Sequence, residues 1–181
     1  MVDGEMIDYG SFQFAAPAFS GVDWFVNACE AVGLGATSVY QAEAPFTSVD
    51  SKLRISLVRH PCSILEDCYT ALVDGKPLQA WGPLSDLVTD GFESFVWDYL
   101  KYKRGFISGV FGTYQAGSVM RAEDMPWAAM EFFDSLGIED LHPLDLPLSN
   151  YTLRPRMYWM SSLRRKVMEA EEEFCDRCEY W

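Results

Sequence analysis

The stretch Phe12-Gln-Phe-Ala-Ala16 predicts a short β-strand, and Pro17-Ala-Phe-Ser-Gly21 after it predicts a loop. From Val22 onward, apolar residues recur at helical spacing as far as Val32, and Gly33 is expected to end this helix. Strand, loop and helix in this order form the layout of an anion site. Backbone N–H groups at the helix start point towards the anion, and the helix dipole favours negative charge.

The rest of the chain alternates in the same way. Further strands are predicted at residues 37–40, 53–58 and 118–121, and amphipathic helices at 64–72, 92–100, 126–136 and 159–174. Alternation of this kind implies parallel pairing through crossovers, with the ligand-binding loops at the carboxyl ends of the strands. We therefore predict one α/β domain over residues 1–181, with three α/β/α layers around a small, mainly parallel sheet. The loops of interest are residues 17–23 and 59–63.

The last predicted helix carries its charges in an unfavourable order. Its basic residues come early and its acidic residues late, which opposes the helix dipole. We therefore expect tertiary packing to hold this helix. The residues concerned are Arg164, Arg165 and Lys166, followed by Glu169, Glu171, Glu172 and Glu173.

Composition excludes some classes of partner. The 181 residues carry a formal net charge of -13, which opposes non-specific binding to nucleic acid or to an anionic membrane surface. No stretch approaches the roughly 18 apolar residues that span a bilayer, and no basic segment followed by an apolar run opens the chain. A cytoplasmic location is therefore expected. The five cysteines include one lone pair at CxxC spacing, Cys175 and Cys178, which predicts neither a disulfide framework nor a metal site.

The loop after the first predicted strand resembles the phosphosulfate loop of the sulfotransferase family. That loop reads Pro-Lys-Ser/Thr-Gly-Thr-Thr/Ser-Trp, and Ser20-Gly21-Val22-Asp23-Trp24 aligns with its second half. Phe19 falls where the family has the Lys that contacts the transferring sulfate. Val22 and Asp23 fall where family hydroxyls bind the 5′-phosphate.

The second family signature binds the 3′-phosphate, and the segment Leu57–Tyr69 resembles it. Arg59, His60 and Pro61 match the Arg-Asn/Asp/His-Pro at the strand end, while Asp67 stands where the family has Ser. A carboxylate at that position would repel a phosphate at close range. The alternative role for Arg59 is that of a structural ion-pair partner beneath the strand end.

Other segments follow the family order. Gln41–Phe46 resembles the segment that supplies the catalytic base, for which Glu43 is the candidate. Residues 120–125 resemble the family's Tyr-Glu-Asp-Met strand end, residues 132–138 its Phe-Leu-Gly helix, and the end of the chain at Glu179-Tyr180 its terminal helix. Arg154 and Arg156 lie where relatives send basic residues to the 3′-phosphate. A second basic cluster is Lys101, Lys103 and Arg104. Either cluster could replace the missing loop Lys, and the alternative for each is a solvated face.

The resemblance implies a P-loop-like sulfotransferase fold that transfers a sulfuryl group from 3′-phosphoadenosine-5′-phosphosulfate to a hydroxyl or amine of a small-molecule or glycan acceptor. Glu43 would be the base. The cofactor-binding residues would be Ser20, Gly21, Val22, Asp23, Trp24, Arg59, Asp67, Arg154 and Arg156. Two other functions stay open, namely a catalytically inactive binding or assembly module and a divergent nucleotide-binding protein with another phosphate ligand.

Overall fold

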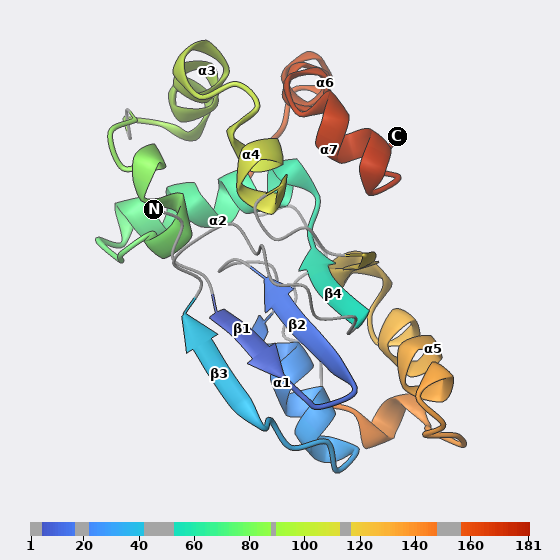
Figure 1. The fold of residues 1–181 in the computed structure, drawn as a ribbon. Helices are drawn as coiled ribbons and strands as arrows, with labels where there is room; N and C mark the ends of the chain where they lie inside the picture. Colours follow the sequence, from blue (N-terminus) through green and yellow to red (C-terminus); the bar gives the residue numbers. More distant parts are fainter. Residues whose placement is uncertain (1–4, 17–21, 42–52, 88–89, 113–116, 148–156) are drawn as a thin grey trace.

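A computed structural model describes residues 5–16, 22–41, 53–87, 90–112, 117–147 and 157–181. Within them a sheet of five strands has the order β3-β1-β2-β4-β5 (Figure 1). The strands are β1 Glu5–Asp8, β2 Phe12–Ala16, β3 Ser38–Gln41, β4 Leu53–Val58 and β5 Ser118–Arg121. The α/β class predicted from the sequence is confirmed, and the sheet is mixed.

The pairing explains why the sheet is mixed. β2, β4 and β5 pair in parallel, whereas β1 runs antiparallel to both of its neighbours, β2 and β3. β1 was not predicted. It forms a tight hairpin with β2 in which the Asp8 carboxylate accepts a hydrogen bond of 2.7 Å from the Gly10 N–H. Gly10 has φ +86°, a left-handed conformation that costs glycine little.

The helices of the described residues cover both faces of the sheet. On one face β2, β4 and β5 direct Phe14, Leu57 and Met120 into a core shared with α1 and α5. On the other face Ala15 and Val58 belong to a second core, under α2, α3, α4, α6 and α7. The α-helices are α1 Val22–Ala31, α2 Pro61–Val73, α3 Phe92–Tyr102, α4 Phe106–Gly112, α5 Trp127–Ser135, α6 Ser161–Ala170 and α7 Glu172–Arg177. Three 3₁₀ segments join them, η1 Gln79–Leu84, η2 Ala122–Asp124 and η3 Pro143–Asp145.

The C-terminal segment departs from the single helix predicted over residues 159–174. It breaks at Glu171 into α6 and α7, which pack beside α3 and α4 (Figure 1). The predicted apolar face is correct, since Leu163, Val167 and Phe174 are all buried. The predicted conflict with the helix dipole is removed for Glu172 and Glu173, because the break places them in the first turn of α7, where negative charge is favoured. It remains for Glu169, which lies in the last turn of α6.

Candidate functional site

Parallel pairing brings three strand ends to one edge of the sheet. β2, β4 and β5 lie side by side and run in the same direction, so their carboxyl ends meet there. The chain continues from these ends into α1, α2 and η2. Open α/β sheets bind their ligands at such an edge. The predicted loop 59–63 therefore belongs to this edge; residues 22 and 23 of the predicted loop 17–23 begin α1, and residues 17–21 lie outside the described residues.

The start of α1 contributes less side-chain chemistry than the resemblance implied. Val22 is half-buried and packs against the core shared by α1 and α5. Asp23 is exposed in the first turn of the helix. Trp24 is buried, and its Nε1 donates a hydrogen bond of 2.9 Å to the Pro147 carbonyl, so its side chain anchors the helix. The predicted cofactor residues Ser20 and Gly21 lie outside the described residues.

Arg59 and Asp67 form an ion pair. Nη1 of Arg59, directly after β4, donates to Oδ2 of Asp67 on α2, and the two side chains are only 11% and 12% exposed. The Asp67 carboxylate, which is expected to repel a phosphate at close range, is thus paired with a guanidinium. This geometry agrees with the alternative interpretation of Arg59 as a structural ion-pair partner at the strand end.

His60 caps the start of α2. Its Nδ1 accepts a hydrogen bond of 3.1 Å from the Cys62 N–H, which satisfies one free donor at the start of α2. Burial, together with the positive charge of Arg164, lowers the pKa of His60 to about 4. The Tyr180 ring packs edge-on against the imidazole. His60 is therefore neutral at pH 7.

Glu123 ties the end of the chain to this edge. Its Oε1 accepts a hydrogen bond of 2.7 Å from the His60 N–H, and its Oε2 accepts one of 3.0 Å from the Tyr180 hydroxyl. Burial and the Glu123 charge raise the pKa of Tyr180. Arg121 adds a hydrogen bond of 2.9 Å from its Nη1 to the Glu179 carbonyl. The similarity of residues 120–125 and 179–180 to family segments is the one sequence signal that marked these residues.

The described residues at this edge do not fit the 3′-phosphate of the cofactor that the resemblance implies. A phosphate contacting Arg59 would have to displace a carboxylate or lie against it. The described side chains at the start of α1 offer the 5′-phosphate no hydroxyl, although a helix start supplies backbone donors and a favourable dipole there. Three other predicted site residues, Glu43, Arg154 and Arg156, lie outside the described residues.

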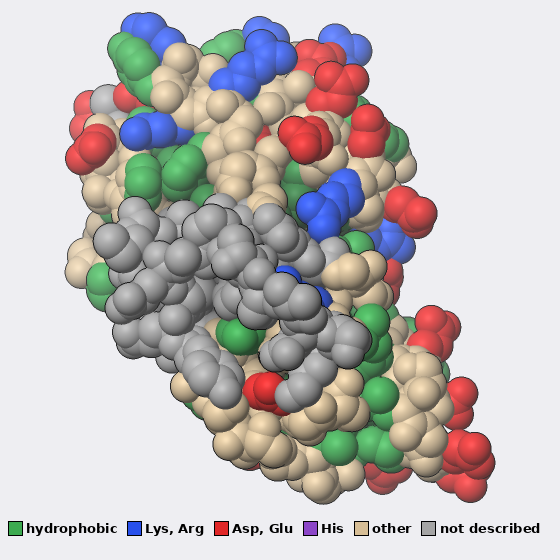
Figure 2. All heavy atoms as spheres, viewed as in Figure 1, with side chains coloured by type: hydrophobic (Ala, Val, Ile, Leu, Met, Phe, Trp, Pro, Cys, Tyr) green, Lys and Arg blue, Asp and Glu red, His purple; other side chains and the backbone are tan. Residues whose placement is uncertain are grey.

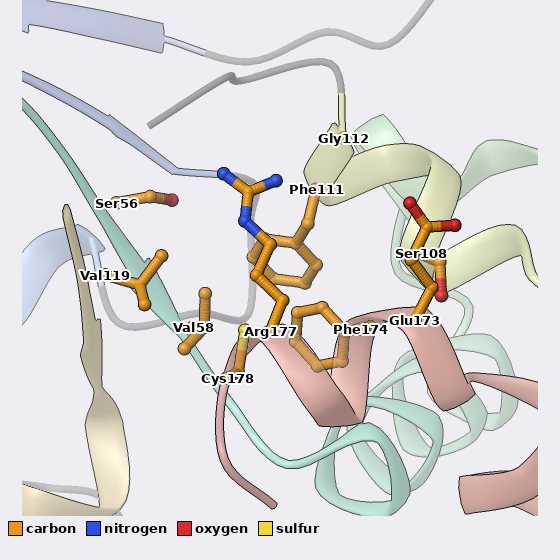
Figure 3. Close-up of a pocket in the computed structure, with 10 residues that line it drawn as sticks. All are labelled: Ser56, Val58, Ser108, Phe111, Gly112, Val119, Glu173, Phe174, Arg177 and Cys178. Carbon is orange, nitrogen blue, oxygen red and sulfur yellow. The ribbon is translucent and has the colours of Figure 1, made fainter. Parts of the chain in front are cut away.

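A small pocket opens on the α4 and α7 side of the sheet (Figure 3). Its volume is about 30 Å³, enough for one or two water molecules. The walls come from β4, β5, α4 and α7, and Phe111 and Phe174 lie side by side along one of them. Ser56 on β4 points into it, and its buried Oγ has no hydrogen-bond partner among the described residues. Sequence reasoning missed this pocket, because its walls are separated by up to 122 positions, from Ser56 to Cys178.

Basic and acidic side chains gather in different areas of the face shown in Figure 2. Figure 2 shows Lys and Arg side chains at the top of the view, where Figure 1 places α3 and α6. Acidic side chains gather on the side where α5 lies. Lys101 lies over the Tyr102 ring and Lys166 over the Trp97 ring, at 4.6 and 4.3 Å from the ring centres. These cations thus cover aromatic surface on the helices.

The comparisons with known proteins returned no family model, no curated protein and no solved structure that matches this chain. Within the described ranges, no group of three or more His, Cys, Asp and Glu side chains is placed to hold a metal ion. None of the helices described above combines the length and the apolar character needed to cross a bilayer. The five cysteines are free and buried.

Proposed function

We propose that this chain is a sulfotransferase-like protein that binds an adenosine nucleotide at the edge where β2 and β4 end. In this proposal it transfers a sulfuryl group from the nucleotide to a hydroxyl or amine of a small-molecule or glycan acceptor. The resemblance names 3′-phosphoadenosine-5′-phosphosulfate as the donor and Glu43 as the base that deprotonates the acceptor.

One observation carries the proposal. Adjacent parallel strands, β2 and β4, lead at the same edge into α1, which begins at Val22, and α2, which begins at Pro61. Neighbouring strands lie about 4.8 Å apart, so the ends of β2 and β4 are within the span of one nucleotide. The start of α1 carries backbone donors and the positive end of a helix dipole. At the start of α2 the dipole remains, but the Cys62 N–H already donates to His60 Nδ1 and the Ser63 and Ile64 N–H groups donate to the His60 carbonyl. The order of family-like segments along the chain supports the same assignment.

A charge change at the start of α1 tests the proposal. Asp23 is exposed in the first helical turn, where it repels an incoming phosphate. Asp23→Asn should tighten nucleotide binding about two- to fivefold, equivalent to about 0.4–1 kcal/mol for a screened charge at this range. Glu30→Gln is the matched control, because it removes an equal charge from the far end of the same helix. It should leave the affinity within about 1.5-fold of wild type.

Calorimetric titration with two stable nucleotides provides the measurement. Adenosine 5′-phosphate and 3′-phosphoadenosine 5′-phosphate are each titrated into the wild-type protein and the two variants at low and moderate salt. Saturable binding of either nucleotide that tightens in Asp23→Asn supports the proposal. If neither nucleotide binds at millimolar concentration, to wild type or to Asp23→Asn, the proposed function is refuted.

A second candidate function is a non-catalytic binding or assembly module on the same scaffold. The observation that favours it is the Arg59–Asp67 ion pair, since the one cation described at the end of β4 is already compensated. In that case neither nucleotide binds in the titrations, while the protein remains folded. The same experiment therefore separates the two candidates.

A further inference from the structure

We propose that Asp67 makes this site select an adenosine nucleotide with a free 3′-hydroxyl over one with a 3′-phosphate. This inference rests on the proposed function, because it concerns the nucleotide that the edge of β2 and β4 binds. It departs from the 3′-phosphorylated cofactor that the resemblance implies. The geometry of the Arg59–Asp67 pair supports the departure.

Asp67 already binds the Arg59 guanidinium, which is the cation that a 3′-phosphate would need. Arg59 Nη1 donates to Asp67 Oδ2, and the two side chains are only 11% and 12% exposed. A phosphate that took Arg59 for itself would leave the Asp67 carboxylate largely buried without its cation, which is strongly unfavourable. A phosphate that approached the intact pair would add up to two negative charges beside a carboxylate. Both routes disfavour a 3′-phosphate.

A hydroxyl group meets no such penalty. An ionised carboxylate has room for about four hydrogen bonds, and the bond from Arg59 occupies one of these acceptor positions of Asp67. A ribose 3′-hydroxyl is a neutral donor that can add one of them. Dinucleotide-binding folds use the same distinction, since an acidic residue there binds a ribose hydroxyl and an arginine accommodates a phosphate at the same position. Asp67 thus supplies the acidic residue, and it holds the nearby arginine in an ion pair.

The other described charges at this edge are of both signs, and Arg121 at the end of β5 is paired with Asp124. His60 is neutral at pH 7, because burial and Arg164 lower its pKa to about 4. Glu123 is held against the His60 backbone, and Asp23 lies in the first turn of α1. Arg164 is the one further cation close to His60 among the described residues. A ligand with fewer negative charges fits this surrounding better.

Paired titrations test the selectivity. Adenosine 5′-phosphate and 3′-phosphoadenosine 5′-phosphate differ only at the 3′ position, so the ratio of their dissociation constants isolates that contact. Wild type should bind adenosine 5′-phosphate at least tenfold more tightly. Asp67→Ser, which frees the Arg59 guanidinium and removes the carboxylate, should shift the ratio at least tenfold towards the 3′-phosphorylated nucleotide.

Two further variants complete the design. Asp67→Asn keeps the side-chain shape and removes the charge, so it should shift the ratio in the same direction if Asp67→Ser fails to fold. Asp74→Asn removes an equal charge from the other end of α2 and should leave the ratio unchanged. Circular dichroism and thermal melts establish that each variant is folded.

The outcomes separate this inference from the proposed function. Wild-type binding that is equal for both nucleotides, or tighter for the 3′-phosphorylated one, overturns the inference while the nucleotide site stands. A preference for adenosine 5′-phosphate that survives both Asp67 substitutions overturns the assignment to Asp67. If neither nucleotide binds to any variant, the proposed function fails and the inference fails with it.

Discussion

Replacing the buried carboxylate at the break between α6 and α7 should destabilise the protein measurably. Glu171 is fully buried, and its two oxygens accept hydrogen bonds from three parts of the structure. Oε1 accepts from the Tyr99 hydroxyl and, at 2.9 Å, from the Gly105 N–H. Oε2 accepts from the N–H and the hydroxyl of Ser108, at 2.8 and 2.7 Å. One side chain thus joins α3 and α4 to the C-terminal helices.

The expected loss of stability in Glu171→Gln follows from how many hydrogen-bond donors lose their acceptor. In Glu171→Gln one carboxylate oxygen becomes an NH₂ group, which faces either the Gly105 N–H or the Ser108 N–H. The hydroxyls of Tyr99 and Ser108 can rotate to accept, but a backbone N–H cannot, so one backbone donor loses its acceptor. A buried donor left without a partner costs about 1–3 kcal/mol. We expect a loss of about 2 kcal/mol in the free energy of unfolding, or about 4–8 °C in Tm for a domain of this size.

Urea unfolding followed by tryptophan fluorescence measures this loss directly. Glu172→Gln is the control, because it removes the same charge from the adjacent, exposed position and should change stability by less than about 0.5 kcal/mol. If Glu171→Gln unfolds within about 0.5 kcal/mol of wild type, the carboxylate does not hold these helices together and the reasoning is wrong.

Three other predictions concern buried titratable and polar groups. The pKa of His60 is about 4 in the folded protein against 6.5 for an ordinary histidine, so only the unfolded chain takes up a proton as pH falls between these values. Stability should therefore fall by up to about 3 kcal/mol across this range. His60→Asn, which keeps a capping oxygen, should remove that part of the slope, whereas His142→Asn, at an exposed cap, should not; identical slopes would contradict the assignment. Ser56→Ala should stabilise the protein by about 1 kcal/mol, because it removes a buried hydroxyl that has no partner among the described residues, and a loss of stability would reveal a bound partner. Burial raises the pKa of Cys62 and of Cys175 to about 12, so iodoacetamide at pH 8 should label these thiols only after unfolding; rapid labelling of the folded protein would refute their burial.

Local sequence patterns were sufficient to predict many of the strands and helices. The predicted strands at residues 53–58 and 118–121 coincide with β4 and β5, because both are short runs bounded by clear turn or helix signals. Hydrophobic spacing also located α1, α2, α3 and α5. These elements depend on the alternation of apolar and polar residues within a single segment. Such information is present in the sequence itself.

The elements that were missed depend on distant partners. β1 has only four residues, Glu5–Asp8, and is stabilised by pairing with a strand on each side, so its own pattern carries little signal. α4 has seven residues, and its first turn is held by the Glu171 carboxylate, 63 positions after Ser108. The same carboxylate sits at the break between α6 and α7. In the sequence, this run of glutamates indicates a solvent-exposed helix face. In the structure one of them, Glu171, is buried and accepts hydrogen bonds from donors distant in the sequence.

Asp67 illustrates the same principle at the candidate site. Read from the sequence, an acidic residue in place of a serine is a defect, because it opposes a phosphate. In the structure it meets Arg59, eight positions earlier, across the junction between β4 and α2, and the pair is largely buried. Removing either residue would leave the other charge largely buried without this partner, which is unfavourable. Under the proposed function, Asp67 would therefore change which ligand this edge accepts.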